Sequence, residues 1–411
     1  MGDFHTIVVY GILFVSLYFE ILLLITYLSG RKSIQDNATM PSPTLWPSVT
    51  IVVPCFNEEK TVAKTIDSLL ALDYPREKLS IVAVDDGSKD STKLILSAYE
   101  QKGVIRSLSK ENGGKHTALN LAISQAKTDL VGCLDADSYV ETGTLKKLVK
   151  HFANEKVMAV IPSLKIHEPK TIIQMIQAVE YRFGVFLRKI FAELDALYVT
   201  PGPFSIFRRS VFTLIGPYRK AHNTEDLEIA MRMQSKHLKI VNAHDAYVHT
   251  SSPRTLKKLY TQRVRWTSGF LKNVLDYRFM FLRPTYGNLG LIVLPLACFS
   301  ILSVAYITGS VIIDGAAQII EHVTRWSIVG INFEWPTFNW FFFNTNVLVT
   351  SGAVAFLLGF LFLLIGYKLS NEKRFFHKEL VWYMMLYHLI VPLWVIRSLW
   401  NVALSRETTW R

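Results

Sequence analysis

The feature of this sequence that most limits its fold is a set of long apolar segments near both ends of the chain. Residues 6–28 are almost continuously apolar and are interrupted only by Glu20. Three more apolar segments follow late in the chain, at residues 289–313, 340–367 and 380–404. Each is long enough to cross a bilayer core, which takes about 20 residues of helix. We therefore predict an integral membrane protein with a retained anchor in residues 1–30 and about three spans in residues 287–411.

Charged residues beside these segments predict their orientation. Arg31 and Lys32 follow the first segment, and the loop between the last two segments is basic, with Lys368, Lys373, Arg374 and Lys378. Residues 314–336, in contrast, carry three acids against Arg325 alone. Because basic loops remain in the cytoplasm, the N-terminus should lie outside a plasma or inner membrane and the middle of the chain inside. Four crossings would place the C-terminus outside, unless the last segment, which contains Arg397, stops near residue 396.

The composition agrees with a membrane-bound protein that binds an anionic ligand. The chain has 45 Lys and Arg against 33 Asp and Glu, a net charge of +12. No basic repeat, finger or basic helix indicates nucleic acid as a partner. An anionic leaflet and an anionic nucleotide account for the excess of positive charge. Only three cysteines are present, too few for a disulfide framework, so we expect the polar domain to face a reducing compartment.

A polar, proline-containing linker at residues 31–48 leads to a region, residues 49–270, that has the pattern of an α/β domain. Short apolar runs alternate with helical patterns: the runs are at 49–53, 80–84, 105–108 and 130–134, and the helical patterns at 58–72, 91–101 and 117–126. This alternation predicts a mostly parallel, Rossmann-like sheet with helices on both faces. Ligands of such sheets bind at the carboxyl ends of the strands.

Polar residues gather where these apolar runs end. Asn57 and Glu58 follow the first run, and Asp85-Asp86-Gly87 follows the second. The aspartates are suited to accept hydrogen bonds from a base or ribose, although Asp-Gly-Ser is also common in turns. The fourth run ends at Asp135-Ala136-Asp137. Paired carboxylates at a sheet edge suit Mg2+ or Mn2+ bridging to a diphosphate; the alternative is a solvated loop.

Two further motifs carry candidate chemistry. Asn112-Gly113-Gly114-Lys115 offers flexible backbone and a cation suited to phosphate oxygens, but it departs from the phosphate loop of nucleoside triphosphatases. Glu225 and Asp226 begin a helical pattern, whose dipole favours their ionised forms. An ionised carboxylate there is suited to act as a general base on an alcohol. The alternative is a structural helix start capped by Thr224.

Two amphipathic stretches lie at about residues 171–191 and 255–280. The first places Phe183, Phe186 and Ile190 on one helical stripe, with Arg188 and Lys189 beside it. Such a helix either packs in the core or lies in the membrane interface, and the spans that follow favour the interface.

Taken in order, these motifs resemble those of membrane-bound inverting glycosyltransferases of family 2. The ordered set is Val52-Val53-Pro54-Cys55-Phe56-Asn57-Glu58, Asp85-Asp86-Gly87-Ser88, Asp135-Ala136-Asp137, Thr224-Glu225-Asp226, then Gln262 with Arg265-Trp266. This family includes cellulose, chitin, hyaluronan and poly-N-acetylglucosamine synthases. The resemblance covers about residues 49–270, plus the anchor before and the spans after, and implies a GT-A-type fold.

The resemblance also implies roles for the site residues. Nucleotide binding falls to Pro54, Asn57, Glu58, Asp85, Asp86, Lys115 and Asp135. The metal would be held by Asp135 and Asp137, and Asp226 would deprotonate the acceptor hydroxyl. Glu225, Gln262, Arg265 and Trp266 would lie near the pyrophosphate and the acceptor, with Trp266 stacking on a sugar ring. Attack opposite the diphosphate then inverts the anomeric centre.

Two functions follow from this resemblance. The first is a processive hexosyltransferase that extends a β-linked polysaccharide from a UDP-sugar, with UDP-GlcNAc as the leading donor, and passes it through the membrane. The second is a transferase that adds one sugar to a membrane lipid. A conduit built from so few spans would need copies of the chain or a membrane partner. A transporter or scaffold that only binds a nucleotide is the third alternative, and it would not need a catalytic base.

Overall fold

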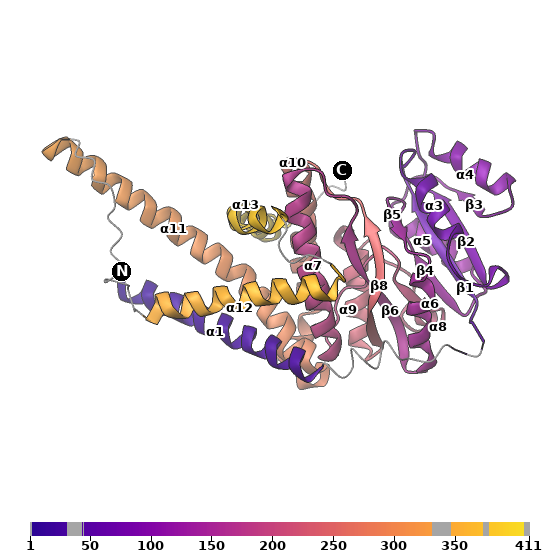
Figure 1. The fold of residues 1–411 in the computed structure, drawn as a ribbon, viewed down its shortest axis with the longest axis horizontal. Coiled ribbons are helices and arrows are strands. Elements are labelled where there is room, and N and C mark those ends of the chain that lie inside the picture. Colours follow the sequence, from indigo (N-terminus) through magenta and orange to yellow (C-terminus); the bar gives the residue numbers. More distant parts are fainter. Residues whose placement is uncertain (1, 31–42, 44, 331–346, 373–377, 407–411) are drawn as a thin grey trace.

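The computed structural model of the protein describes residues 2–30, 43, 45–330, 347–372 and 378–406. It consists of an α/β domain attached to several long apolar helices (Figure 1). Most of the predicted linker, including Arg31 and Lys32, lies outside the described residues. The limits 31–48 and 49–270 for linker and domain remain predictions.

One eight-stranded sheet forms the centre of the α/β domain, in the order β3-β2-β1-β4-β7-β6-β8-β5. Its first half is parallel and consists of β1 (Val49–Cys55), β2 (Leu79–Asp85), β3 (Arg106–Ser109) and β4 (Leu130–Cys133). The prediction that β1 stops before Pro54 is wrong, because Pro54 pairs with Val84 of β2. Proline is accommodated there because the pairing of β1 with β4 already ends at Val52.

The second half of the sheet is mixed. Its strands are β5 (Ser138–Val140), β6 (Val157–Ile166), β7 (Ile206–Arg208) and β8 (Lys239–Thr250). Strand β7 runs antiparallel to both β4 and β6, β6 runs parallel to β8, and β5 runs antiparallel to β8. The α/β class is confirmed, with antiparallel pairs added on one side of the parallel half.

Alternate residues of β1 pack into two hydrophobic clusters, one on each face of the sheet. Ile51 and Val53 belong to one cluster, with residues of α3 (Val62–Leu70), α4 (Thr92–Gln101) and α6 (Thr144–Lys150). Val52 belongs to the other, with residues of α5 (Lys115–Gln125), α8 (Ser210–Ile215) and α9 (Glu225–Ser235). This is the expected period of two for a strand covered on both faces. Helix α3 begins later than predicted, because residues 58–61 form the turn that leaves β1.

Two long helices, α7 (Ile172–Glu193) and α10 (Leu256–Asp276), lie between the sheet and the apolar helices (Figure 1). The apolar stripe of α7 is covered on two sides. Phe186 and Ile190 pack with α1 (Gly2–Ser29) and α12 (Val347–Leu369), and Ile176 and Val179 pack with α12 and α13 (Lys378–Ala403). The core-packing alternative therefore describes these side chains, and a location of α7 and α10 in the membrane interface remains a prediction.

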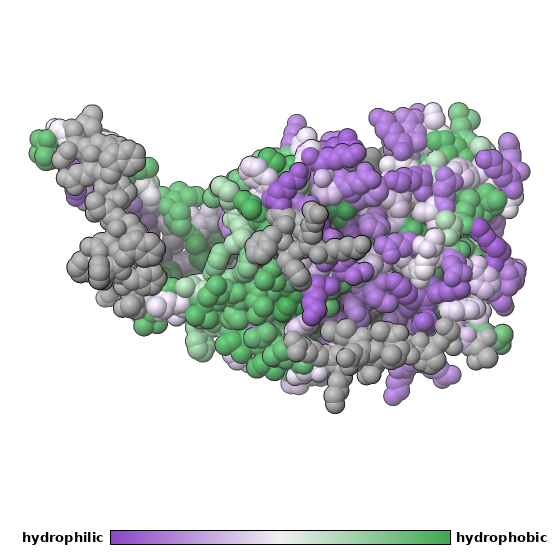
Figure 2. Space-filling model, in the orientation of Figure 1, coloured by the Kyte–Doolittle hydropathy of each residue, from purple (hydrophilic) through white to green (hydrophobic). Residues whose placement is uncertain are grey.

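Four helices in the described part of the chain are long and apolar enough to cross a membrane: α1 (Gly2–Ser29), α11 (Leu294–Val329), α12 (Val347–Leu369) and α13 (Lys378–Ala403). They mark an integral membrane protein. Figure 2 shows hydrophobic surface over these helices and mainly hydrophilic surface over the α/β domain. Residues 314–336 were expected to form a loop between two spans. This expectation is wrong for residues 314–329, because α11 continues to Val329, and residues 331–336 lie outside the described residues. An exposed Glu321–Arg325 pair, four residues apart, supports that extension.

Helix α13 differs from the other three. Figure 1 shows it almost along its own axis, whereas α1 and α12 run across the view. Near its start, Glu379 accepts a bond from Arg182 of α7 at 3.4 Å. Near its end, Ser398 bonds to α10, and the Arg406 carbonyl accepts from Lys272 of α10 at 2.6 Å. Its mean hydropathy of 1.5 is below the 2.3 to 2.5 of the others.

We therefore predict that α13 lies along the membrane surface and that the C-terminus is on the side of the α/β domain, opposite to the expectation from counting four crossings. Both ends of α13 are tied to helices that also pack on the domain, so they cannot lie on opposite sides of a bilayer core about 30 Å thick. A C-terminal alkaline phosphatase fusion should be inactive, while a fusion after Gly330 should be active. Phosphatase activity from the C-terminal fusion would show that α13 crosses.

Candidate active site

The predicted site residues converge on one lysine. Lys115, the first residue of α5, places its Nζ atom 2.8 Å from Asp135 Oδ1, 3.5 Å from Asp226 Oδ2 and 3.7 Å from Glu225 Oε1. These residues come from the end of β4 and the first turn of α9, which are far apart in the sequence. The side chain of Lys115 is only 10% exposed. A buried ammonium thus joins the predicted metal carboxylate to the predicted base.

Asp86 places Lys115 there. Its carboxylate accepts bonds from the backbone N–H groups of Gly113, at 3.1 Å, and Gly114, at 2.8 Å, and pairs with Lys110 at 2.6 Å. Gly114 has a φ of +92°, a conformation that glycine adopts without strain. Asp86 is 3% exposed. Its carboxylate therefore holds the loop that delivers Lys115, a role that the sequence did not suggest.

Burial and charge act in opposite directions on this cluster. Burial alone would lower the pKa of Lys115, but Asp135, Asp226 and Glu225 raise it well above its usual value. Burial raises the pKa of Asp226, as do the charges of Glu225 and Asp135, while Lys115 lowers it. Lys115 is thus a permanent cation, and it favours the ionised form that a general base needs.

The two carboxylate oxygens of Asp226 differ in their surroundings. Oδ2 accepts a bond from the backbone N–H of Gly202 at 2.9 Å. Oδ1 is buried and has no hydrogen-bond partner among the described residues. Oδ1 is therefore the atom that remains available to accept a proton from a hydroxyl group.

Gly202 is a site residue that the sequence analysis missed. A Cβ atom at this position would lie 2.8 Å from Asp135 Oδ2 and 2.9 Å from Asp226 Oδ2, and closer still to Lys115 Nζ. A side chain therefore does not fit between the lysine and its carboxylates. Its surroundings in the sequence, Thr200-Pro201-Gly202-Pro203, were the available signal.

Gly202→Ala is expected to lower kcat about 10²-fold. The added methyl group would displace Lys115, Asp135 and Asp226 from one another, and a displacement of about 1 Å can cost this much in rate. The matched control is Gly143→Ala. Gly143 lies directly before α6 in the α/β domain, with a φ of −87° that alanine also adopts and with open space around it. Steady-state transfer rates of both variants check this. Wild-type kcat in Gly202→Ala would contradict a tight fit at the cluster.

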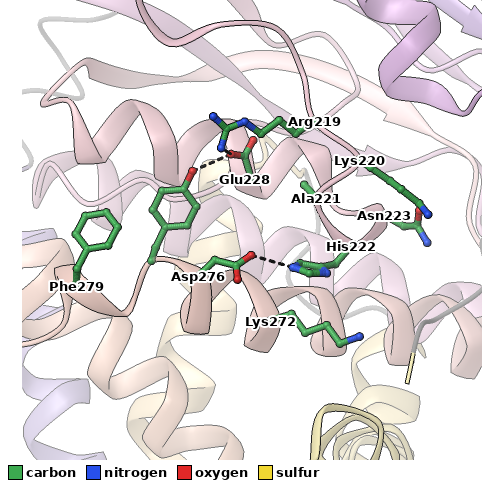
Figure 3. Close-up of a pocket in the computed structure, with 10 residues that line it drawn as sticks. Arg219, Lys220, Ala221, His222, Asn223, Glu228, Lys272, Asp276 and Phe279 are labelled. Atoms are coloured by element: carbon green, nitrogen blue, oxygen red, sulfur yellow. Dashed lines mark hydrogen bonds and ion pairs between the residues drawn. The ribbon is translucent and has the colours of Figure 1, made fainter. Parts of the chain in front are cut away.

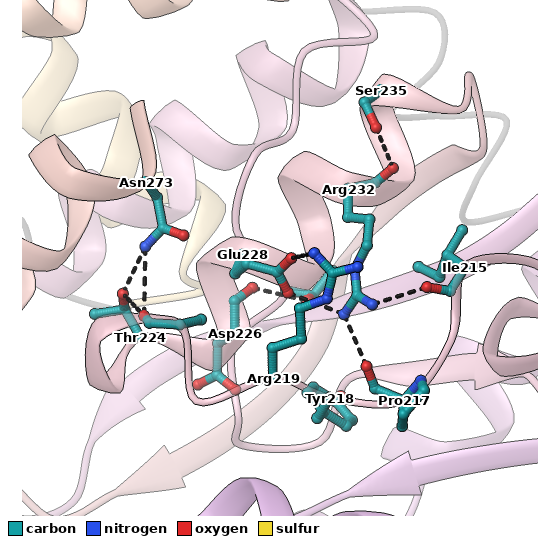
Figure 4. Close-up of polar contacts among 12 residues, drawn as sticks. Ile215, Pro217, Tyr218, Arg219, Thr224, Asp226, Glu228, Arg232, Ser235 and Asn273 are labelled. Atoms are coloured by element: carbon teal, nitrogen blue, oxygen red, sulfur yellow. Dashed lines mark hydrogen bonds and ion pairs between the residues drawn. The ribbon is translucent and has the colours of Figure 1, made fainter. Parts of the chain in front are cut away.

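Helix α9, which carries Asp226, is fixed by a buried ionic network (Figure 4). Glu228 pairs with Arg232 at 2.9 Å and accepts a bond from the Tyr277 hydroxyl at 2.7 Å. Arg232 also donates to the carbonyls of Ile215 and Pro217, at 2.8 and 3.0 Å. The network ties α9 to α8 and to the end of α10.

The structural alternative for Thr224, side-chain capping of α9, is wrong. Thr224 is at the N-cap position but makes no side-chain cap bond. Its hydroxyl donates to the Ala221 carbonyl and accepts from Asn273 of α10, both at 2.9 Å. Gly269 allows this approach, because a Cβ atom there would collide with Thr224. Thr224 therefore joins the loop before Asp226 to α10.

Residues predicted to bind the nucleotide line the ends of β1 and β2. Asn57 has a left-handed backbone, with φ of 57°, and its side chain accepts from the Lys89 N–H at 2.8 Å. Asp85 accepts from the Ser88 N–H at 3.1 Å and from the Ser109 hydroxyl at 3.2 Å. Glu58 accepts from Thr61 at 2.8 Å. These bonds hold the two strand ends together, and nucleotide binding by these residues and Pro54 remains a prediction.

Asp135 and Asp137 have the donor chemistry that a divalent cation needs. In the residues that the structure describes, no group of three or more His, Cys, Asp or Glu side chains is arranged to hold a metal ion by itself. Burial, together with the charges of Asp135 and Glu58, raises the pKa of Asp137 to about 7. A cation would relieve this repulsion. Two carboxylates with phosphate oxygens as further ligands are a usual Mg2+ arrangement, so the residues fit the predicted metal.

Three of the four residues predicted near the pyrophosphate and acceptor, Gln262, Arg265 and Trp266, lie on α10, and Glu225 lies on α9. Arg265 donates to the Asn223 carbonyl at 3.3 Å and so reaches the loop before Asp226. The ring of Trp266 lies under the Arg263 guanidinium, 4.4 Å from the ring centre. Arg263, which the sequence analysis did not single out, pairs with Glu180 of α7 at 2.7 Å. The Gln262 side-chain oxygen is buried and has no partner in the described part of the chain.

Comparison with known proteins agrees with this geometry. Residues 50–215 match the family model Glycosyl transferase family 2. Poly-beta-1,6-N-acetyl-D-glucosamine synthases are among the most similar curated proteins. The protein from Staphylococcus aureus (strain COL) is 33% identical over 224 residues, which is 54% of each chain. The one from Staphylococcus epidermidis is 30% identical over the same share. The chain thus matches about half the length of these relatives.

A solved structure resembles nearly the whole chain. It is a mannosyltransferase from Pyrobaculum calidifontis in complex with GDP-Man and Mn2+, with a TM-score of 0.60 at 18% identity, covering 95% of this chain and 99% of the other. The fold is therefore that of a GT-A domain, attached to helices that are apolar enough to cross a membrane. Residues 50–215 of this domain match the model of glycosyl transferase family 2, which agrees with the resemblance that the order of its motifs indicated.

Proposed function

We propose that the protein is a processive, inverting hexosyltransferase. It transfers a sugar from a UDP-sugar, with UDP-GlcNAc as the leading donor, to the end of a growing β-linked polysaccharide. The reaction takes place at the cytoplasmic face of the membrane, and the polymer then enters the membrane region. The sequence similarity to poly-beta-1,6-N-acetyl-D-glucosamine synthases supports this choice of donor and product.

The proposal rests on the different surroundings of the two Asp226 carboxylate oxygens. Its Oδ2 atom is held by Gly202 and lies near Lys115, while its buried Oδ1 atom has no partner among the described residues. An acceptor hydroxyl that donates to Oδ1 loses its proton as its oxygen attacks the anomeric carbon. The bond from that carbon to the diphosphate breaks on the opposite face, and UDP leaves with the bonding electron pair. One displacement of this kind inverts the anomeric centre.

The donor side of the proposal rests on the ends of the parallel strands. Asn57, Glu58, Asp85 and Asp86 are proposed to hold the uridine, with Pro54 shaping the end of β1. Asp135 and Asp137 would hold Mg2+ or Mn2+, which supplies charge neutralisation for the leaving diphosphate. Lys115 is already positioned against Asp135 and is proposed to add a second positive charge beside the phosphates.

The size of the product tests this function. The full-length protein in nanodiscs is given labelled UDP-GlcNAc with Mg2+ or Mn2+, and other UDP-sugars and GDP-mannose are supplied singly and in pairs. A ladder or a high-mass product from UDP-GlcNAc alone is the expected result. A product that needs two sugars would indicate a heteropolymer. A single lipid-soluble adduct would overturn processive synthesis.

A second candidate, transfer of one sugar to a phosphate-bearing lipid, is favoured by Arg188 of α7. Its Nε and Nη2 atoms are buried and unpartnered in the described part of the chain. Burial lowers the pKa of Arg188 to about 10, even though Tyr181 and Tyr198 act to raise it. The guanidinium therefore stays charged at neutral pH. Tyr198 precedes the segment that contacts Asp226 through Thr200. An unpaired buried cation is costly, and an anionic group on the acceptor would neutralise it.

Arg188→Gln separates the two candidates. If the acceptor is a lipid phosphate, the variant should raise KM for a polyprenyl phosphate about 10-fold to 100-fold, the worth of a charged hydrogen bond. Arg188→Lys should retain part of the affinity, and KM for the UDP-sugar should stay unchanged. Turnover of a polyprenol as good as that of its phosphate would exclude this candidate.

A further inference from the structure

A pocket of about 550 Å3 lies beside the loop that leads to Asp226 (Figure 3). One wall is the loop, with Arg219, Lys220 and His222, and the other is the end of α10, with Lys272 and Asp276. None of these residues belongs to the Lys115 cluster. The pocket is therefore separate from the candidate catalytic groups, although the loop in its wall leads directly to Asp226.

The pocket carries an excess of positive charge. Its two acids are both engaged: Asp276 pairs with His222 at 2.9 Å, and Glu228 pairs with Arg232 at 2.9 Å and with Arg219 at 3.6 Å. The Lys272 ammonium donates to a neutral carbonyl, that of Arg406. The lining residues Arg219, Lys220 and Lys272 thus outnumber the two lining acids by three to two, and Arg232 adds a further positive charge beside Glu228. An anionic ligand would find a favourable potential here.

The pocket also lies where the chain enters its membrane region. Tyr277 lines it and packs in one apolar cluster with Leu289, Val293 and Leu294, at the start of the first helix after the domain. Phe279 lines it as well and is 41% exposed, and Leu282 close by is 67% exposed. Cationic groups beside exposed apolar side chains suit a molecule with a charged head and an acyl chain.

The loop in the wall is held in an unusual conformation. Ala221, His222 and Asn223 all have positive φ, of 45°, 55° and 62°. Non-glycine residues adopt this conformation only where the surrounding structure enforces it. Asn273 donates to the Ala221 carbonyl at 3.5 Å, and Arg265 donates to the Asn223 carbonyl at 3.3 Å. A ligand on Lys220 and His222 would add to these restraints directly before Thr224 and Asp226.

We propose that this pocket binds the phosphate headgroup of an anionic membrane lipid. Lys220 and Lys272 contact the phosphate from opposite walls, and the acyl chains leave past Phe279 and Leu282. The bound headgroup stabilises the conformation of residues 221–223. This lipid is a structural ligand, distinct from donor and acceptor, and its binding does not depend on which sugar the enzyme transfers.

The test measures lipid binding rather than activity. The full-length protein in phosphatidylcholine nanodiscs is titrated with labelled phosphatidylglycerol, and binding is measured for wild type and for Lys220→Ala combined with Lys272→Ala. Each lysine near a membrane surface is worth about a fivefold change in affinity for anionic lipid, so the double variant should bind roughly 30-fold more weakly. The matched control is Lys93→Ala combined with Lys156→Ala, two exposed lysines of the α/β domain, which should bind as wild type does.

Unchanged phosphatidylglycerol binding in the double variant would overturn the proposal. So would inorganic phosphate or UDP that binds the pocket as tightly as the lipid does, since the ligand would then need no acyl chain. Binding of UDP-GlcNAc at the donor site and the unfolding temperature should match wild type in the double variant. If both fall together with lipid binding, the loss reflects misfolding, and Lys220→Gln alone is then expected to give about a fivefold loss with a wild-type unfolding temperature.

Discussion

Asp226→Asn is expected to lower kcat for sugar transfer about 10³-fold or more while the Kd for the UDP-sugar stays close to wild type. The amide has nearly the shape of the carboxylate, so the Gly202 contact and the fold should persist. It cannot take the proton of the acceptor hydroxyl, and general base catalysis is worth about 10² to 10⁴-fold. Transfer of labelled sugar and calorimetric binding of the donor measure the two quantities separately.

Asp73→Asn is the matched control for this substitution. Asp73 is a surface acid that pairs with Lys146 at 2.7 Å, so it makes an ion pair without any contact with the site. Its variant should transfer sugar at the wild-type rate. If Asp226→Asn also kept wild-type kcat, Asp226 would not be the base, and a protein that only binds nucleotides would become the better description.

Lys115→Gln is expected to have the second largest effect, on stability and on activity. It removes the cation that pairs with the carboxylates of Asp135, Glu225 and Asp226. Leaving buried charges without their partner costs about 3 to 5 kcal/mol in other proteins. Loss of a positive charge beside a leaving diphosphate lowers kcat by about 10² to 10³-fold. Lys146→Gln, which breaks the surface pair with Asp73, should change the free energy of unfolding by less than about 1 kcal/mol.

The pH dependence of this variant tests the role of Lys115 more specifically. In wild type, kcat/KM should rise with pH as Asp226 loses its proton, because only the ionised carboxylate is a base. Lys115 lowers the pKa of Asp226 against the effect of burial. Its removal should therefore move the rise of kcat/KM to higher pH. An unshifted profile with a reduced rate would mean that Lys115 acts on the diphosphate alone.

Much of this site could be predicted because its residues obey local rules. Asp85, Asp86, Asp135 and Asp137 directly follow apolar runs, and parallel strands bring their carboxyl ends to one edge of a sheet. The first-turn position of Asp226 was readable from helical periodicity. Order along the chain, more than any single motif, indicated the family, and residues 50–215 match its model.

Other features depend on contacts between distant segments, which periodicity does not encode. Gly202 matters because three distant segments place Lys115, Asp135 and Asp226 around the position that a Cβ atom would occupy there. Asp86 was expected at the nucleotide, and its buried carboxylate supports the loop before Lys115. Helix α13 is apolar enough to be a span, but its ion pair with α7 and its bonds to α10 set its direction.

The stereochemistry of the product tests whether the acceptor oxygen, deprotonated by Asp226, displaces UDP in a single step. Because the sugar of UDP-GlcNAc is α-linked to the diphosphate, one displacement must give a β-linked product. The anomeric proton coupling in the nuclear magnetic resonance spectrum of the labelled product distinguishes the two linkages. A β linkage is the predicted result, and an α linkage would contradict the proposed mechanism.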